Sequence, residues 1–232
     1  MAPFFLFNIS EIINIAMIEW NDLPSCYNSE PVNHFRIQNV FANEVYDELL
    51  GTYEQAWNLT TKGFYDPGIT YPDVWQQVYD FVMETRNVVP DLIHNYLEED
   101  LHNDYIITNL QMSNHIFPDL APGDLIRGWH RDGATKYFNM VIYFDNETHG
   151  NIEFKNVETD QEKSYPYESN SAVMWANCDH RVWHQFRNSG SGVRKTLFIT
   201  WAPSTSEMKD YMLTHDDHTL TEIHNRQLNI QS

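Results

Sequence analysis

Short runs rich in β-branched and aromatic residues fill the second half of the chain, and Asn, Asp, Gly or Ser separate them. The clearest runs cover residues 137–145, 150–154, 172–175, 183–186 and 194–201. Runs of this length between turn-forming residues are typical of β-strands. A series of such strands at close spacing is typical of an all-β barrel or sandwich. The pattern predicts a β-structured core in this half of the chain.

In the first half of the chain, the apolar residues recur with the period of an α-helix instead. Apolar residues recur at helix spacing in three stretches: Val45, Leu49, Leu50, Tyr53 and Ala56; Val74, Val78, Phe81 and Val82; and Leu92, Ile93, Tyr96 and Leu97. Because this spacing gathers apolar side chains on one face, the stretches predict helices that pack against a core. We expect one domain over 1–232, with a helical layer over about 35–103, a barrel over about 104–202 and a C-terminal helical tail over 203–232.

The triplet His130-Arg131-Asp132 is the strongest chemical signal in the sequence. Residues i and i+2 of an extended strand point to the same face, so His130 and Asp132 can reach one metal ion while Arg131 points away. Two imidazoles and one carboxylate are the protein ligands of mononuclear non-haem iron sites, and they leave coordination positions open. The triplet therefore predicts two of three metal ligands.

The third ligand must come from another segment. Two histidines four residues apart, His180 and His184, are candidates, and either one can face the metal. Arg194 follows at the head of an apolar strand. Because a guanidinium forks onto a carboxylate through two charge-assisted hydrogen bonds, Arg194 is a candidate anchor for a carboxylate ligand.

The order of these residues, over about 105–201, resembles the prolyl-hydroxylase-like branch of the iron(II)/2-oxoglutarate-dependent dioxygenases. The shared order is His-x-Asp, a small-residue turn before a strand, a later His, and an Arg ten residues beyond it. The resemblance favours His184 over His180, since its distance to Arg194 and its position after Asp179 fit the pattern better. It implies a mostly β fold: a double-stranded β-helix, the jelly-roll of cupin-like proteins, with the N-terminal helices packed on it.

The resemblance also implies roles for individual residues. His130, Asp132 and His184 would bind Fe(II), and Arg194 would hold the distal carboxylate of 2-oxoglutarate. Tyr143 matches a tyrosine that family members often add to this site. On an extended strand Tyr143 shares a face with Asn139, so we expect Asn139 to line the same cavity and to take part in cosubstrate binding.

The implied reaction consumes dioxygen and 2-oxoglutarate, releases succinate and carbon dioxide, and hydroxylates an unactivated C–H bond. Asp132 fills the carboxylate position that related halogenases leave vacant, so hydroxylation is expected rather than chlorination. Ascorbate is an expected accessory reductant.

The substrate is expected to be a prolyl-type peptide or a small metabolite, because the segment around 114–128 departs from the prolyl-hydroxylase pattern. A metal-binding barrel without catalysis and a zinc hydrolase with the same ligands are the alternatives.

Composition narrows the partners and the compartment. The 33 acidic and 14 basic residues give a formal net charge of −19, which disfavours nucleic acid and anionic membrane as partners. With only Cys26 and Cys178, no disulfide framework is expected, and a cytoplasmic location follows as the default. The stretch from Met1 to Trp20 contains two Glu and no basic leader, so we expect neither a secretory signal nor a membrane span, and Met17 is an alternative start.

Overall fold

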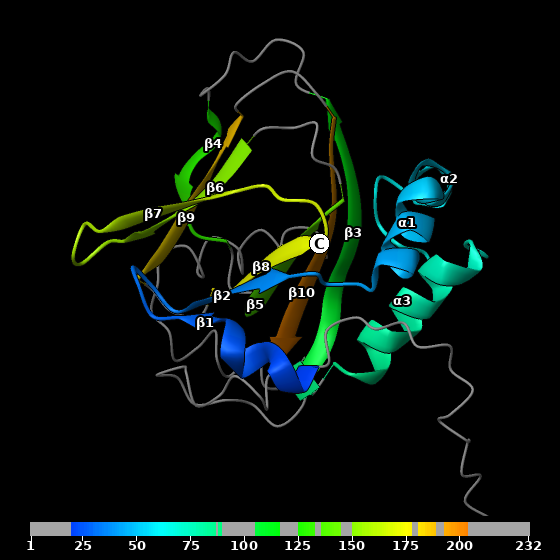
Figure 1. Ribbon diagram of the computed structural model, residues 1–232, viewed down its shortest axis with the longest axis horizontal. Coiled ribbons are helices and arrows are strands. Elements are labelled where there is room, and N and C mark those ends of the chain that lie inside the picture. Colours follow the sequence, from blue (N-terminus) through cyan, green and yellow to red (C-terminus); the bar gives the residue numbers. More distant parts are fainter. Residues whose placement is uncertain are drawn as a thin grey trace, which may run out of the picture.

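The computed structural model describes residues 20–86, 88–89, 105–116, 125–132, 136–144, 150–177, 181–188 and 193–203. Two antiparallel sheets dominate these residues, and three α-helices lie beside β3 and β10 of the larger sheet (Figure 1). The mostly β fold with an N-terminal helical layer is therefore confirmed. Within the described residues, no helix is both long enough and apolar enough to cross a membrane.

The larger sheet has six strands. Their spatial order is β1 (Tyr27–Asn28), β2 (His34–Gln38), β8 (Ser171–Ala176), β5 (Phe138–Tyr143), β10 (Val193–Pro203) and β3 (Tyr105–Ile116). Every residue of β5 and β8 is buried. Both strands lie in the interior of a sheet that is covered on both faces, which explains why their sequences read as continuous apolar runs rather than as alternating ones.

The smaller sheet has four strands. Their order is β4 (Leu125–His130), β9 (Val182–Asn188), β6 (Gly150–Asn156) and β7 (Glu162–Pro166). Along β6 the buried and partly exposed residues alternate, because only one face of this strand packs against the core. A cluster that includes Val141, Phe154 and Trp175 fills the space between the two sheets.

The helices are α1 (Asn43–Gly51), α2 (Tyr53–Leu59) and α3 (Asp73–Glu84), preceded by a 3-10 helix at Trp20–Cys26. The first predicted stripe forms two helices rather than one, because the chain changes course at Thr52, whose hydroxyl donates to the carbonyl of Glu48 (2.7 Å). The second stripe forms α3, with Val74, Val78 and Val82 buried. The third stripe at 92–97 and the tail at 203–232 lie outside the described residues, apart from residue 203 at the end of β10.

Candidate metal centre

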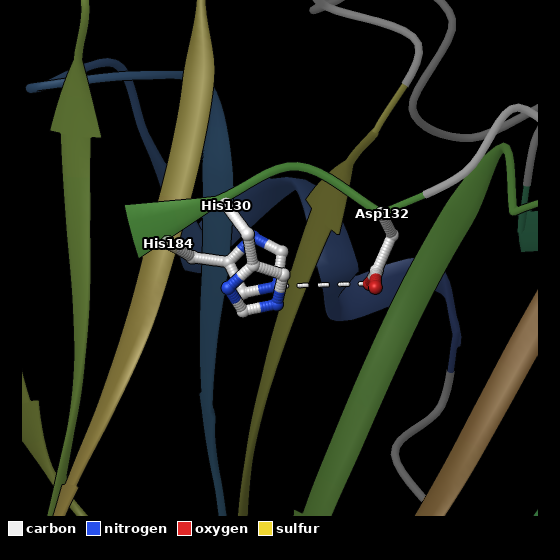
Figure 2. Close-up of side chains that lie close together, drawn as sticks. All are labelled: His130, Asp132 and His184. Carbon is white, nitrogen blue, oxygen red and sulfur yellow. Dashed lines mark ion pairs between the residues drawn. The ribbon is translucent and has the colours of Figure 1, made fainter. Parts of the chain in front are cut away.

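Strand register brings the two histidines together. His130, the last residue of β4, is the cross-strand partner of His184 in β9, and the centroids of the two rings are 4.2 Å apart. Asp132 lies two residues beyond β4, and its carboxylate faces the two rings (Figure 2). One potential ligand atom from each of the three residues lies within 4.8 Å of the other two. In the described part of the chain, no second group of His, Cys, Asp or Glu has this arrangement.

The hydrogen bonds of His130 define its tautomer. Its Nδ1 lies 2.7 Å from the carbonyl oxygen of Gly128, and because a carbonyl only accepts, Nδ1 carries the proton. The other nitrogen, Nε2, is buried and has no hydrogen-bond partner. Burial lowers the pKa of His130, so the ring is neutral near pH 7. A neutral imidazole with an unused lone pair is a suitable metal ligand.

His184 is buried, with only 1 % of its surface exposed. Its Nε2 lies 3.6 Å from Oδ2 of Asp132, and its Nδ1 has no hydrogen-bond partner. Burial lowers the pKa of His184 to about 3. The second ring is therefore also neutral near pH 7. His180, the alternative third ligand, lies outside the described residues.

The backbone of Asp132 is clamped by Asn177, a buried residue just after β8. Oδ1 of Asn177 accepts from the backbone amide of Asp132 (3.1 Å), and Nδ2 of Asn177 donates to the backbone carbonyl of Asp132 (2.8 Å). The two bonds satisfy both backbone groups of Asp132 at a position outside the strand ladder. Sequence reasoning did not find Asn177, because its role depends on a contact between segments 45 residues apart.

The carboxylate of Asp132 is held by several donors. Nδ2 of Asn139 donates to Oδ2 (2.9 Å), and Nζ of Lys136 donates to Oδ1 (3.2 Å). Arg127 lies 3.7 Å from Oδ1. Burial alone would raise the pKa of Asp132, but a carboxylate is stabilised by its close contact with His184 and by the Lys136 ammonium, and these interactions lower the pKa. Asp132 is therefore an anion near pH 7, as a metal-ligating carboxylate must be.

This donor set fits a divalent transition metal. Nε2 of His130 has no hydrogen-bond partner among the described residues, and Nε2 of His184 faces the ionised carboxylate of Asp132, so two neutral imidazoles and one carboxylate can share one ion. Two histidines and one carboxylate with further positions open are the ligand set of non-haem Fe(II) sites. A cavity of about 170 Å³ adjoins Asp132 and His184 and extends to Arg194.

A second group of polar side chains lies around Arg194 at the start of β10. Arg194 lies over the rings of Tyr167 and Phe186, at 5.3 and 5.0 Å from their centroids, and its NH1 is 3.5 Å from the Tyr167 hydroxyl. Its Nε is buried and has no hydrogen-bond partner in the part of the chain that the structure describes, and the same holds for the hydroxyl of Tyr143. Tyr143 stacks on Tyr167 with ring centroids 4.8 Å apart. The structure thus brings Arg194 and Tyr143 into one cluster and adds Tyr167, which sequence reasoning missed.

Gly150 makes room for Tyr167. A Cβ atom at Gly150 would lie 2.0 Å from Cε2 of Tyr167 and 2.7 Å from the carbonyl oxygen of Arg187. Both distances are far shorter than a carbon tolerates, so the position requires glycine. The predicted strand over 150–154 begins with this glycine, but the sequence did not indicate the tyrosine that packs on it.

Asn139 shares its strand face with Tyr143 but contacts different residues. Its Nδ2 donates to Asp132, and its Oδ1 accepts from the hydroxyl of Thr200 (3.2 Å). The described structure therefore places Asn139 against the carboxylate of the candidate metal centre. Cosubstrate binding by Asn139 stays a prediction.

No protein-family model and no curated relative matches the chain. Solved structures do match it. A prolyl-4-hydroxylase from Pseudomonas putida superposes with a TM-score of 0.53 at 13% identity, over 80% of this chain and 90% of that one. The viral collagen prolyl hydroxylase from Paramecium Bursaria Chlorella virus-1 gives 0.50 at 12% identity, over 74% and 90%. The non-haem alpha-ketoglutarate-dependent carbocyclase SnoK from nogalamycin biosynthesis gives 0.51 at 8% identity, over 80% and 83%.

These matches concern the arrangement of the sheets and helices. They agree with the fold that the His-x-Asp motif implied, and they include two prolyl hydroxylases. The chain has the jelly-roll fold of the 2-oxoglutarate- and Fe(II)-dependent oxygenases, with helices packed on the larger sheet.

Proposed function

We propose that the protein is a non-haem iron(II)- and 2-oxoglutarate-dependent dioxygenase that hydroxylates a peptide or a small metabolite. One observation carries the proposal: Asp132 and His184 of the two-histidine, one-carboxylate cluster line one cavity together with Arg194, an arginine without a carboxylate partner among the described residues. Such a cavity offers a metal site at one side and a carboxylate anchor at the other. This combination suits a cosubstrate that is itself a dicarboxylate.

His130, Asp132 and His184 would hold the iron. When bound, the iron supplies the redox chemistry that couples dioxygen reduction to cosubstrate decarboxylation and substrate oxidation. The protein contributes ligand orientation: Gly128 fixes the tautomer of His130, and Asn139 and Asn177 fix Asp132. Pre-set ligands of this kind bind metal without the cost of ordering side chains.

Arg194 would bind the distal carboxylate of 2-oxoglutarate. Its guanidinium lies between aromatic rings in a partly buried position, where a charge-assisted pair is stronger than in water. The unpartnered hydroxyl of Tyr143 would donate to the same carboxylate, and the hydroxyl of Tyr167 is close enough to Arg194 to join it. Val141, Trp175 and Phe198 line the cavity and would keep bulk water from the reacting centre.

The solved structures support the cosubstrate more than the substrate. The epimerase SnoN, which superposes with a TM-score of 0.50 at 9% identity over 74% of this chain and 79% of that one, is described in complex with Fe3+, alpha ketoglutarate and nogalamycin RO. Two other matches are named prolyl hydroxylases. Since the names of these proteins refer to prolyl hydroxylation and to nogalamycin, the fold alone does not select between a prolyl-type peptide and a small metabolite.

The test is iron-dependent succinate release from 2-oxoglutarate by the purified full chain. We expect Fe(II) and 2-oxoglutarate to be required together and zinc not to substitute, which separates an oxygenase from a zinc hydrolase. Arg194→Ala should weaken 2-oxoglutarate binding by about 2 to 5 kcal/mol while metal still binds. Arg36→Ala is the matched control, because Arg36 pairs with Glu168 (2.8 Å) away from the cavity. If 2-oxoglutarate does not bind the metal-loaded wild type, the proposal is wrong.

A further inference from the structure

The cavity beside the candidate metal centre is cationic, although the protein is strongly acidic. Three of its lining residues, Arg127, Lys136 and Arg194, are basic, and Asp132 is its only acidic lining residue among those described. Only 14 of the 232 residues are Lys or Arg, against 33 Asp or Glu. The cavity therefore has a local excess of positive charge in a chain of net negative charge, and an anion entering the cavity would be attracted by it.

Two of these cations converge on the same carboxylate oxygen. Lys136 and Arg127 lie 3.2 and 3.7 Å from Oδ1 of Asp132, whereas Asn139 and His184 approach Oδ2. Among the described residues, neither cation has another acidic partner within ion-pair distance. Lys136 lies over the ring of Phe198, 4.9 Å from its centroid, in the wall of the cavity. The side chain of Arg127 is 57% exposed, so this pair lies where the cavity opens to solvent.

The charges do not balance once the proposed ligands are bound. A divalent metal would neutralise Asp132 with positive charge to spare, and a dianionic cosubstrate would be matched by the metal and Arg194. Arg127 and Lys136 would then lose most of the attraction of Asp132 and would have no counter-charge of their own. Because both cations lie close to one oxygen atom at the mouth of the cavity, they would repel each other, and an anion that joins them would relieve this repulsion.

We propose that Arg127 and Lys136 bind an anionic group, a carboxylate or a phosphate, on the primary substrate. This inference rests on the proposed function and specifies its substrate class: an acidic molecule rather than a neutral one. The guanidinium fork and the ammonium together match a single carboxylate or phosphate. Arg194 is left for the cosubstrate, since it lies on β10 against Tyr167 rather than at Asp132.

The test uses the full chain loaded with Mn²⁺ under nitrogen, which allows binding to be measured without turnover. Titration with 2-oxoglutarate comes first and is read by calorimetry. With 2-oxoglutarate saturating, acetate and its neutral counterpart acetamide are added as probes. Broadening of their methyl proton resonances by the bound Mn²⁺ reports how often each probe occupies the cavity. Inorganic phosphate, followed by its ³¹P resonance, separates a phosphate site from a carboxylate site.

We expect acetate to be broadened about tenfold more than acetamide in the wild type, which corresponds to one charge-assisted pair. The ³¹P broadening of phosphate is compared between the wild type and the variants. The double variant Arg127→Met with Lys136→Met should lose this preference. Lys136→Arg keeps the positive charge and should therefore retain the preference for acetate. This variant shows whether a substitution at position 136 disturbs the structure in general. Lys163→Met is the matched control, because Lys163 is an exposed residue of β7 outside the cavity.

Three results would overturn the substrate assignment: equal broadening of acetate and acetamide, an unchanged preference in the double variant, or, in a parallel titration without 2-oxoglutarate, acetate broadening that disappears once 2-oxoglutarate saturates the protein. The last result would mean that both cations serve the cosubstrate. Failure of the proposed function has a different signature, because it would be seen as absent 2-oxoglutarate binding in the first titration, before any probe is present.

Discussion

Asn139 and Asp132 are joined by a buried hydrogen bond of 2.9 Å, from Nδ2 of the amide to Oδ2 of the carboxylate. The amide is held from its other side by Thr200, whose hydroxyl donates to Oδ1 of Asn139 (3.2 Å). Asn139 and Thr200 are cross-strand partners in β5 and β10 and are fully buried. The central strands of the larger sheet thus set the orientation of the candidate metal-ligating carboxylate.

Replacing Asn139 should therefore weaken metal binding. Asn139→Leu keeps the approximate volume but removes the donor, so Oδ2 of Asp132 is no longer fixed. Loss of a partner of this kind typically reduces metal affinity 10- to 100-fold, and we expect a loss of about that size, measured by Mn²⁺ titration. Thr200→Val removes only the more distant hydroxyl and should cost less. Wild-type metal affinity in Asn139→Leu, with the fold intact, would show that the hydrogen bond has no such role.

The strand period predicted which residues share a face but not which residues each of them contacts. Asn139 and Tyr143 do share the inner face of β5. At about 3.3 Å per residue, however, they are about 13 Å apart along the strand. Asn139 therefore meets Asp132, whereas Tyr143 meets Tyr167 near Arg194. A sequence pattern indicates which residues share a face of a strand. The residues that each of them contacts depend on the register of the neighbouring strands.

Gly150→Ala should disturb the group around Arg194. The added Cβ would lie 2.0 Å from the Tyr167 ring, so the ring must move away from Tyr143 and Arg194. Overpacking of this kind typically costs about 1 to 3 kcal/mol of stability. If Tyr167 helps to position Arg194, 2-oxoglutarate affinity should also fall about tenfold, by the loss of one such contact. Calorimetry with the metal-loaded variant measures it.

Two variants separate the effect of the ring from that of an added methyl group. Gly51→Ala places a Cβ where no atom lies within 4 Å and should alter neither stability nor affinity adversely. Tyr167→Phe keeps the ring and removes the hydroxyl. Full 2-oxoglutarate affinity in both Gly150→Ala and Tyr167→Phe would exclude Tyr167 from the carboxylate site.

The pairing of His130 with Asp132 and the positions of the strands were predictable because their signals are local, whereas His184 was favoured only by the resemblance. His130 and Asp132 are two residues apart, and the apolar runs mark the strands directly. Tyr167 and Asn177 were not predictable, since each acts through a partner at least 17 residues away, in a segment whose position depends on the assembled sheets. The break between α1 and α2 at Thr52 was missed for a related reason: the apolar stripe continues across it.

The choice of His184 over His180 can be tested by metal content. His184→Ala removes a buried ring that lies 3.6 Å from Asp132 and opposite His130, so we expect the purified variant to bind no iron or to bind it at least about 100-fold more weakly. His180→Ala should retain iron and oxygen uptake. The opposite pattern, with His180→Ala inactive and His184→Ala active, would reassign the third ligand.

A separate buried histidine should make stability depend on pH. His34 in β2 is fully buried, and its Nδ1 lies 2.8 Å from the carbonyl oxygen of Val32. Because that carbonyl only accepts, Nδ1 carries the proton, and Nε2 accepts from the hydroxyl of Tyr165 in β7 (2.7 Å). The ring stacks on Phe154 with centroids 5.0 Å apart. Neutral His34 thus joins one sheet to the other.

Burial lowers the pKa of His34 from 6.5 to about 4, so the unfolded chain binds this proton more readily than the folded one. The free energy of unfolding should therefore be unaffected by His34 above pH 6.5. It should fall by about 1.4 kcal/mol per pH unit as the pH drops from 6.5 towards 4.

Urea unfolding of the metal-free protein at pH 7.5 and pH 5.0 measures this slope, and comparison with His34→Gln removes the contributions of the other histidines. Because glutamine does not titrate, the variant should be less stable at pH 7.5 but should lose less stability on acidification. Equal losses in the two proteins would mean that His34 takes up its proton in the folded state as easily as in the unfolded chain.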